Sequence, residues 1–239
     1  MFEEFTGFRH EYKYIEPEID LIAAQKRLCT VMKKDPHVTG KGYYSIRSLY
    51  FDDYDNRYLN ENIDGVDERS KWRIRVYDCS SGHIRLERKV RKSDLISKQT
   101  CMIDSSMFLK IVKKKAYASA DNPPLLNMFI NEIKTCGLHP VIIVEYERTP
   151  FVLSAGNTRV TIDRTIRSSS ELDALLADRS LNSRPVLLSG QNLIEVKFDS
   201  YLPDHIAHTI EHGRMRRETF SKYYLARKFT YNGIASSYR

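Results

Sequence analysis

The chain has 239 residues, of which 41% are hydrophobic, with ten Gly and eight Pro. This apolar fraction suffices for one sizeable core and excludes disordered, collagen-like and low-complexity proteins. No stretch approaches the roughly 18 consecutive apolar residues of a transmembrane helix, and the charged N-terminus lacks the apolar core of a signal peptide. We therefore expect a cytoplasmic protein without a transmembrane segment, folded as a single domain over residues 1–239.

Positive charge is concentrated in one segment of the chain. The formal net charge is +7, and residues 69–98 alone hold ten Lys or Arg against three Asp or Glu, which is also +7. The rest of the chain is therefore neutral. A block this basic indicates an anionic partner, such as nucleic acid, anionic lipid or a phosphate-rich small molecule.

Alternation of polar and apolar residues, which is typical of β-strands, dominates the sequence. In chain order we predict strand 8–15, helix 17–34, strands 43–52, 70–77, 83–91 and 97–103, helices 105–118 and 124–136, strands 141–153 and 159–166, helix 170–178, strand 193–199, and helices 203–213 and 221–229. Ser170 and Asp173 form a possible capping box for helix 170–178, and Ser221 is the expected N-cap of the last helix. These elements indicate one α+β domain.

Most of the predicted strands carry charge on one face and apolar side chains on the other. In strand 70–77, Trp72 and Ile74 share one side, whereas Arg73 and Arg75 share the other. The same alternation recurs in the predicted strands 8–15, 83–91, 159–166 and 193–199. This pattern fits an open sheet with one solvated face, or a barrel closed on its polar face with helices packed over the apolar exterior.

The composition of the charged faces favours the barrel. Eight strands can enclose an interior of ligand size. Burying so many basic side chains costs too much free energy unless a polyanion neutralises them. Carboxylates on the same faces, at Glu11, Glu87 and Glu195, would supply the hard oxygen ligands that a divalent cation on phosphate needs. We therefore predict an eight-stranded antiparallel β tunnel with helices packed on the outside.

Eight short segments carry a resemblance to a known protein family, in the family's order. They are HEYKY at 10–14, SLYFDD at 48–53, WRIRVY at 72–77, LERKVRKSD at 86–94, VEYERTPF at 144–151, RVTID at 159–163, IEVKF at 194–198 and FSKYY at 220–224. With these segments the sequence resembles the catalytic domain of the vacuolar transporter chaperone (VTC) proteins, which are polyphosphate polymerases among the triphosphate tunnel metalloenzymes. The resemblance implies a tunnel whose basic lining binds a chain of phosphates.

The resemblance also implies roles for individual residues. The phosphate-binding residues carried over by position are Lys13, Arg73, Arg75, Lys89, Arg148, Arg159 and Lys222. Among them, Arg73, Arg75 and Lys89 are the expected catalytic residues, because they would neutralise the phosphoryl group in transfer. Glu195 matches the metal-binding glutamate on the family's final strand, and Glu11 is the next candidate ligand for Mn²⁺ or Mg²⁺.

The implied function is metal-dependent phosphoryl transfer on a triphosphate or polyphosphate chain, with polyphosphate synthesis from ATP as the first candidate. An inorganic triphosphatase would use water as the attacking group, and a non-catalytic polyphosphate sensor would use the same lining. A nucleic-acid-binding surface is a further alternative, but Trp72 lies on the apolar face, which argues against base stacking. We expect ATP, inorganic triphosphate or polyphosphate as partners and no nucleic acid; the metal, the product length and the oligomeric state stay open.

Overall fold

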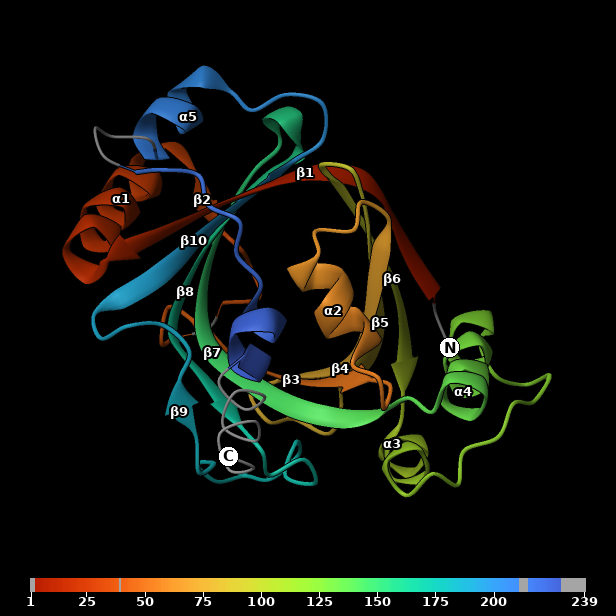
Figure 1. The fold of residues 1–239 in the computed structure, drawn as a ribbon. Coiled ribbons are helices and arrows are strands. Elements are labelled where there is room, and N and C mark those ends of the chain that lie inside the picture. The colour runs from red at the N-terminus through yellow and green to blue at the C-terminus, as the bar shows by residue number, and fades with distance from the viewer. Residues whose placement is uncertain (1–2, 39, 211–214, 229–239) are drawn as a thin grey trace.

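A computed structural model describes residues 3–38, 40–210 and 215–228 of the protein (Figure 1). The long strands are β1 (Glu3–Pro17), β3 (Tyr44–Asp52), β4 (Arg69–Tyr77), β5 (Ile84–Lys92), β6 (Leu95–Ile103), β7 (His139–Leu153), β8 (Thr158–Ser169) and β10 (Gln191–Phe198). Two short strands are β2 (Lys33–Lys34) and β9 (Arg184–Pro185). The helices are α1 (Glu18–Val31), α2 (Arg57–Ile63), α3 (Ser105–Val112), α4 (Pro124–Cys136) and α5 (Asp204–Ile210), and residues 222–228 are also helical.

The eight long strands close into one antiparallel barrel. Around the barrel their order is β7, β3, β4, β5, β6, β1, β10 and β8, and β8 pairs back with β7. The short strands extend the sheet, since β2 pairs with β7 and β9 pairs with β8. This topology confirms the predicted eight-stranded antiparallel tunnel.

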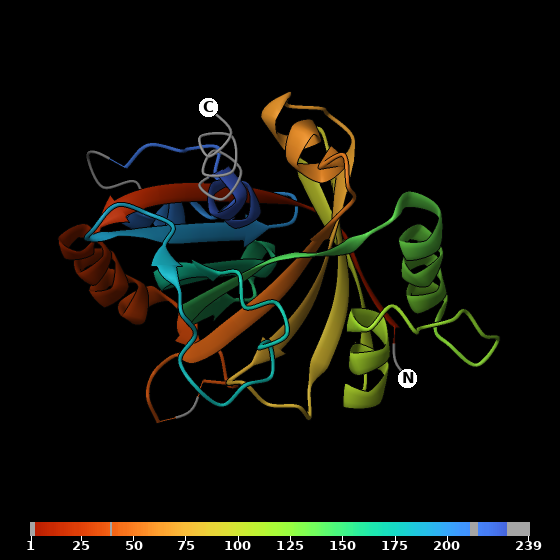
Figure 2. The same ribbon diagram turned by 60° about the horizontal axis from the view of Figure 1, so that its bottom comes forward.

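The helices lie outside the wall of strands. In Figure 1, α1 and α5 lie together beside β1 and β10, and α3 and α4 lie on the opposite side of the barrel. Figure 2 shows that α2 and the helical residues 222–228 lie over the same end of the barrel, at the top of this view. We call this end the mouth. No helix in the described ranges is long and apolar enough to cross a membrane.

The hydrophobic core lies largely between the barrel wall and the helices. Trp72 and Ile74 on β4 are fully buried, and the Trp72 ring packs against Phe129 of α4 with centroids 4.9 Å apart. A second apolar cluster joins α1 and α5 to the wall, where Leu21 and Ile206 are both fully buried. Because the apolar side chains of the strands point outwards, their charged side chains are left to line the interior.

The helix α2 is absent from the elements that the sequence predicts. Its first N–H groups bind carboxylates that precede it in the chain, rather than a local capping residue. Asp52 accepts from the backbone N–H of Tyr58 (2.9 Å) and of Leu59 (3.1 Å), and Asp53 accepts from that of Arg57 (2.9 Å). These two aspartates end the SLYFDD segment, so the end of strand β3 positions α2 at the mouth.

The last helix, at residues 222–228, agrees with the sequence-based prediction. The Oγ atom of Ser221 accepts from the backbone N–H of Tyr224 at 3.3 Å, which confirms Ser221 as the N-cap. The hydroxyl of Tyr223 donates to the buried carboxylate of Asp52. This bond ties the last helix to the same strand end that positions α2.

The predicted helix 170–178 is wrong, because this segment forms a series of turns. Arg47 of β3 donates to the carbonyl oxygens of Ala177 (2.6 Å) and Arg179 (2.6 Å). These bonds hold the segment against the barrel with Leu175 fully buried. The contacts that hold this segment are therefore made with a distant strand, and the local pattern at 170–178 does not show them.

The remaining predicted helices form, with differences at their ends. Helix 124–136 has the predicted bounds, whereas α1 and α3 end before the predicted residues 34 and 118. The predicted helix 203–213 corresponds to α5, and its residues 211–213 lie outside the described ranges.

Candidate functional site

The charged faces of neighbouring strands meet inside the barrel. The register places Lys13 of β1 opposite Glu195 of β10, and Arg73 of β4 opposite Glu87 of β5. Alternate residues of a strand share one face. The side chains two positions away from these four residues along each strand therefore point into the same interior. The interior is therefore a cluster of basic and acidic groups contributed by strands far apart in the sequence.

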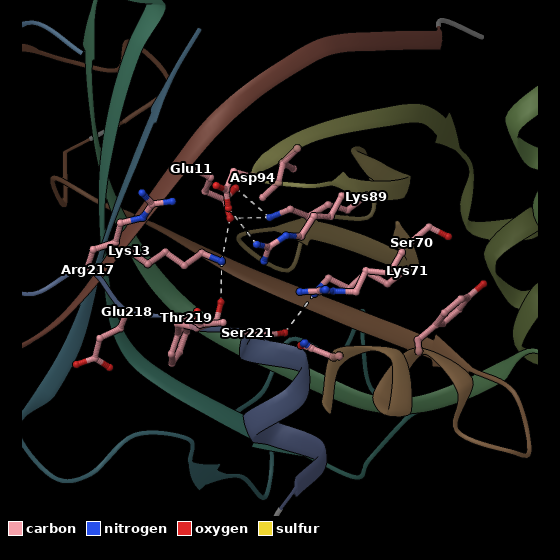
Figure 3. A pocket seen from close by; sticks show the side chains of 16 residues that line it. Glu11, Lys13, Ser70, Lys71, Lys89, Asp94, Arg217, Glu218, Thr219 and Ser221 are labelled. Carbon is pink, nitrogen blue, oxygen red and sulfur yellow. Dashed lines mark hydrogen bonds and ion pairs between the residues drawn. The ribbon is translucent and has the colours of Figure 1, made fainter. Parts of the chain in front are cut away.

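Two adjoining cavities occupy the interior and the mouth. The inner cavity has a volume of about 50 Å³ and is lined by eight cationic side chains: Lys13, Lys71, Arg73, Arg75, Lys89, Arg148, Lys197 and Lys222. The outer cavity has a volume of about 310 Å³ and lies at the mouth, between α2 and residues 217–221 (Figure 3). Both cavities are lined by Lys13, Lys71 and Lys89, so one leads into the other.

The structure brings together most of the residues that the sequence singled out. Six of the seven predicted phosphate ligands line the inner cavity: Lys13, Arg73, Arg75, Lys89, Arg148 and Lys222. Arg159 lines neither cavity; its guanidinium is 2.9 Å from Asp35 and donates to the hydroxyl of Tyr44 at 3.1 Å. Of the predicted metal ligands, Glu195 lines the inner cavity and Glu11 lines the outer one.

Two basic residues of the inner cavity are missing from the sequence-based set. Lys71 and Lys197 lie two positions from Arg73 and Glu195, on the same inward faces. The alternation of polar and apolar residues that identifies Arg73 and Glu195 therefore also identifies these two lysines.

The paired arginines of β4 are held in place by polar groups around them. Arg73 binds Glu87, with Nη2 at 2.6 Å and Nε at 2.7 Å from Oε2, and it donates to the hydroxyl of Tyr50 at 3.2 Å. Arg75 donates to the hydroxyl of Tyr146 at 3.1 Å and lies 3.7 Å from Glu87. Burial favours a raised pKa for Glu87, but Arg73 and Arg75 hold it well below its ordinary value. The glutamate is therefore a fixed anion beneath both guanidinium groups.

Glu11 binds lysines from three strands. Its carboxylate lies 2.8 Å from Nζ of Lys89, 2.9 Å from Nζ of Lys13 and 3.7 Å from Nζ of Lys197. Burial and the nearby Glu195 would raise the pKa of Glu11, but the three lysines together lower it to about 2. Burial is also the largest influence on Lys89, whose pKa falls to about 7 despite the contact with Glu11.

A second ion-pair group lies deeper in the barrel and includes the last helix. Arg148 binds Asp163 through Nε (2.6 Å) and Nη2 (2.7 Å), and the same Nη2 lies 3.2 Å from Glu195. Lys222 reaches in from the last helix, with Nζ 2.7 Å from Asp163 and 3.9 Å from Glu195. Lys197 lies 3.1 Å from Glu195. Despite its burial, Glu195 has a pKa well below the ordinary value, because Lys197, Lys222 and Arg148 surround it.

The positive charges around Lys71 affect its pKa. Its Nζ donates to Oγ of Ser221 at 3.2 Å and points, with Lys13 and Lys89, into the same space (Figure 3). Burial, followed by repulsion from Lys89, Lys13 and Arg73, lowers the pKa of Lys71 well below its ordinary value. The cluster therefore places positive charges close together at a cost in free energy.

Cations outnumber carboxylates in this cluster. Within the described ranges, the eight basic side chains of the inner cavity share four carboxylates, those of Glu11, Glu87, Asp163 and Glu195, so that basic groups exceed acidic groups by four. Charge in a poorly solvated interior is stabilised when an opposite charge enters. The arrangement is therefore suited to bind an anion with several charges.

The carboxylates of this site fit a divalent cation that has further ligands from elsewhere. In the part of the chain that the structure describes, no group of three or more His, Cys, Asp or Glu side chains could hold a metal ion. Glu11 and Glu195 lie on adjacent strands, and their low pKa values keep both ionised. Mg²⁺ commonly takes one or two protein carboxylates and completes its shell with phosphate oxygens and water. The two glutamates therefore fit a cation that binds together with a phosphate ligand.

Comparisons with known proteins agree with this architecture. Among solved structures, a putative adenylyl cyclase from Hippeastrum, described as having a dominant triphosphatase activity, is 12% identical and has a TM-score of 0.55 over 92% of this chain and 96% of that chain. A putative adenylate cyclase from Bacillus halodurans is 12% identical, with a TM-score of 0.49 over 88% of each chain. A search of curated proteins finds no match. At 12% identity and a TM-score of 0.55, the likeness to the Hippeastrum protein concerns the fold alone.

The sequence itself matches a family model over most of its length. The VTC domain model matches residues 8–231, which include β1 from residue 8 onward, all the other strands of the barrel and the last helix. The eight segments that suggested this family therefore lie within the match. This chain belongs to the VTC domain family.

Proposed function

We propose that this protein binds the phosphate chain of ATP inside the barrel and transfers phosphoryl groups to a growing polyphosphate. The observation that carries the proposal is the inner cavity, where eight cationic side chains converge from the strands and the last helix. A linear chain of phosphates has the charge to neutralise this lining and the narrow shape to enter a closed eight-stranded barrel. Membership of the VTC domain family favours polyphosphate synthesis over other phosphoryl transfers.

Binding of the phosphate chain exchanges one set of anions for another. The ion pairs of Glu11 and Asp163 hold Lys89 and Lys222 in the ligand-free protein. Phosphate oxygens would replace these carboxylates as the partners of the lysines. The inner cavity has a volume of about 50 Å³ with these ion pairs in place, so the exchange has to move the paired side chains apart.

The chain's own cations supply the electrostatic part of catalysis. Arg73 and Arg75 present planar forks of N–H donors that suit phosphate oxygens, and Glu87 with the tyrosines holds them in position. Lys89 contributes a single compact charge. Phosphoryl transfer leaves little covalent work to the protein, so positioning and charge neutralisation carry most of the rate enhancement.

A divalent cation has a defined place in this proposal. Glu195 and Glu11 would hold Mn²⁺ or Mg²⁺ together with phosphate oxygens. When bound, the cation neutralises charge on the phosphate oxygens and so favours attack on the phosphorus.

Hydrolysis of triphosphate is the second candidate function. It is favoured by the structural likeness to the Hippeastrum protein, which is described as having a dominant triphosphatase activity. The two reactions use the same binding groups and differ in whether water or a phosphate end attacks. A polyphosphate sensor would bind the same chain without turnover.

The products formed from ATP separate these functions. Purified protein is incubated with ATP and either Mn²⁺ or Mg²⁺, and the products are resolved on a polyphosphate gel. Polymerase activity gives a ladder of chains that is absent for Arg75→Ala and unchanged for Lys115→Ala, an exposed lysine beyond α3. Free phosphate without a ladder would contradict synthesis and support hydrolysis, and no turnover would contradict both enzymes.

A further inference from the structure

The outer cavity at the mouth has a charged lining in which basic side chains outnumber acidic ones. Among the described residues, six basic and three acidic side chains line it: Lys13, Arg69, Lys71, Lys89, Arg91 and Arg217, against Glu11, Asp94 and Glu218. Its volume is about 310 Å³, compared with about 50 Å³ for the inner cavity. A hollow with this excess of positive charge attracts anions.

Half of these basic residues have no acidic partner. In the part of the chain that the structure describes, no ion pair with a carboxylate forms at Arg69, Lys71 or Arg217, whereas the other three basic side chains each have one. Arg69 donates instead to the carbonyl oxygen of Val66, and Lys71 donates to Oγ of Ser221 at 3.2 Å. These neutral partners leave the positive charge uncompensated.

The register of β4 and β5 places like charges opposite each other at the mouth. Lys71 lies opposite Lys89, and Arg69 lies opposite Arg91, whereas the next inward-facing pair joins opposite charges. Like charges directly across a strand pair are destabilising. Burial, followed by repulsion from Arg91, lowers the pKa of Arg69. An anion between the two strands would remove this electrostatic cost.

The basic side chains of β4 form a row that is longer than a triphosphate. Arg69, Lys71, Arg73 and Arg75 follow one another at intervals of two residues on the inward face, and Lys71 lines both cavities. At a rise of about 3.3 Å per residue, Arg69 lies about 20 Å from Arg75 along the strand. Side chains stand roughly perpendicular to a strand, so their spacing follows that of the backbone. A triphosphate held by Arg73 and Arg75 is therefore too short to reach Arg69 as well.

We propose that the outer cavity binds the phosphate groups of a linear polyphosphate that follow the three in the inner cavity, and that Arg69 and Arg91 bind these further groups. This inference rests on the proposed function, since it needs the phosphate chain in the inner cavity. The planar fork of a guanidinium suits phosphate oxygens. The contact of Arg91 with Asp94, at 3.4 Å between exposed groups, is weak enough for phosphate to replace it. The two arginines are thus specificity-determining residues for chain length.

The test compares inorganic triphosphate with linear hexaphosphate by calorimetry. The variants are Arg69→Gln, Arg91→Gln and the control Lys92→Gln, which removes an exposed positive charge next to Arg91 on the other face of β5. A charge-assisted hydrogen bond corresponds to about a tenfold to hundredfold change in affinity. The wild type and Lys92→Gln should prefer hexaphosphate by this factor. Each arginine variant should keep the affinity for triphosphate and lose most of the preference.

The other outcomes contradict the outer site in different ways. Equal binding of the two ligands by the wild type, or a preference that survives in both arginine variants, overturns the outer site and leaves the inner one intact. An equal loss for both ligands in an arginine variant also overturns it, because that residue then acts on the inner site or on the fold. A preference that is lost in Lys92→Gln as well shows that net charge sets it.

Two further results keep the test decisive. If Arg69→Gln fails to fold, Arg91→Gln decides alone, because its side chain is 34% exposed and its loss leaves no buried group unpaired. Failure of both inorganic triphosphate and hexaphosphate to bind the wild type contradicts the proposed function and the outer site with it. Loss of the chain-length preference alone contradicts only the outer site.

Discussion

Lys89 and Glu11 form an ion pair inside the barrel, in which Nζ lies 2.8 Å from Oε1 and 2.9 Å from Oε2 of the glutamate. The same carboxylate lies 2.9 Å from Nζ of Lys13. If the proposed function is correct, a phosphate ligand competes with Glu11 for these lysines, and a divalent cation competes with the lysines for Glu11. Binding of either one would then release a partner for the other, which would make their binding mutually favourable.

This coupling can be measured by substituting the glutamate. We expect Glu11→Gln to bind inorganic triphosphate at least as tightly as the wild type without metal, because Lys13 and Lys89 lose a competing anion. The gain in affinity on adding Mn²⁺ should be smaller, since the cation loses a ligand. Calorimetry with and without Mn²⁺ measures both quantities, with the exposed Glu68→Gln as the control. An undiminished Mn²⁺ effect in Glu11→Gln would place the metal elsewhere.

Triphosphate binding should take up protons at pH 8. Burial lowers the pKa of Lys89 to about 7, so most of this lysine is neutral at pH 8 in the ligand-free protein. A bound phosphate raises this pKa, and Lys89 then gains a proton from solution. Affinity should therefore fall as the pH rises above about 7. Calorimetry in buffers of different ionisation enthalpy counts the protons taken up.

The Lys89→Arg variant is the control for this proton uptake. Arginine stays charged across the range, so the variant should take up fewer protons than the wild type with the same ligand at the same pH. Protons that the ligand itself takes up on binding are the same for both proteins and therefore cancel in this comparison. Equal proton uptake by the two proteins would show that Lys89 is already charged before the ligand binds.

The two arginines of β4 should differ in their effect on stability. Arg73→Ala removes the 2.6 Å partner of the fully buried Glu87 and should lower the free energy of unfolding by about 3–5 kcal/mol. Arg75→Ala should cost less, because Arg75 lies 3.7 Å from Glu87 and Arg73 remains as its partner. Both variants should lose roughly tenfold to a hundredfold in triphosphate affinity.

A second substitution separates the effect of Arg73→Ala on stability from its effect on triphosphate binding. Glu87→Gln in the Arg73→Ala background removes the buried charge that has lost its closest partner, so part of the stability should return while triphosphate affinity stays low. Urea unfolding and calorimetry provide the two measurements. Unchanged triphosphate binding in both single variants would refute the phosphate-binding role of these arginines.

Substitution of Trp72 tests whether this residue belongs to the hydrophobic core or to a nucleic-acid-binding surface. The ring is fully buried against Phe129, so Trp72→Ala should lower the free energy of unfolding by about 3–5 kcal/mol. The folded variant should bind inorganic triphosphate as the wild type does. If the variant is instead stable and loses affinity for single-stranded DNA, the stacking alternative is correct.

The strands could be predicted from the sequence because each one has two chemically different faces. In β4, Trp72 and Ile74 pack under α4 while Arg73 and Arg75 line the cavity, and this contrast repeats every two residues. The alternation alone did not distinguish an open sheet from a closed one. Closure depends on the pairings of β1 with β6 and β10 and of β3 with β7, which join strands far apart in the sequence and which no local pattern specifies.

The contacts that local sequence patterns do not show mark where the structure departs from expectation. Arg159 is an expected phosphate ligand, and in the structure it contacts Asp35 beside β2, more than a hundred positions earlier. The predicted helix 170–178 is replaced by turns whose carbonyl groups bind Arg47 of a distant strand. The helix α2 depends on the carboxylates of Asp52 and Asp53, which precede it instead of opening it as a local cap.

Lys71 and Lys197 could have been included from the sequence alone. Both follow the same two-residue alternation as Arg73 and Glu195, and both line the inner cavity. The position-by-position resemblance to the family does not include these two lysines, whereas the inward face of each strand does.

A crystal structure of the protein with inorganic triphosphate and Mn²⁺ is the most direct test of the central claim. We expect phosphate oxygens within hydrogen-bond distance of Arg73, Arg75 and Lys89. We also expect anomalous signal from Mn²⁺ beside the carboxylates of Glu11 and Glu195. Triphosphate bound only on the outer surface of the barrel, with the ion pair of Lys89 and Glu11 intact, would contradict it.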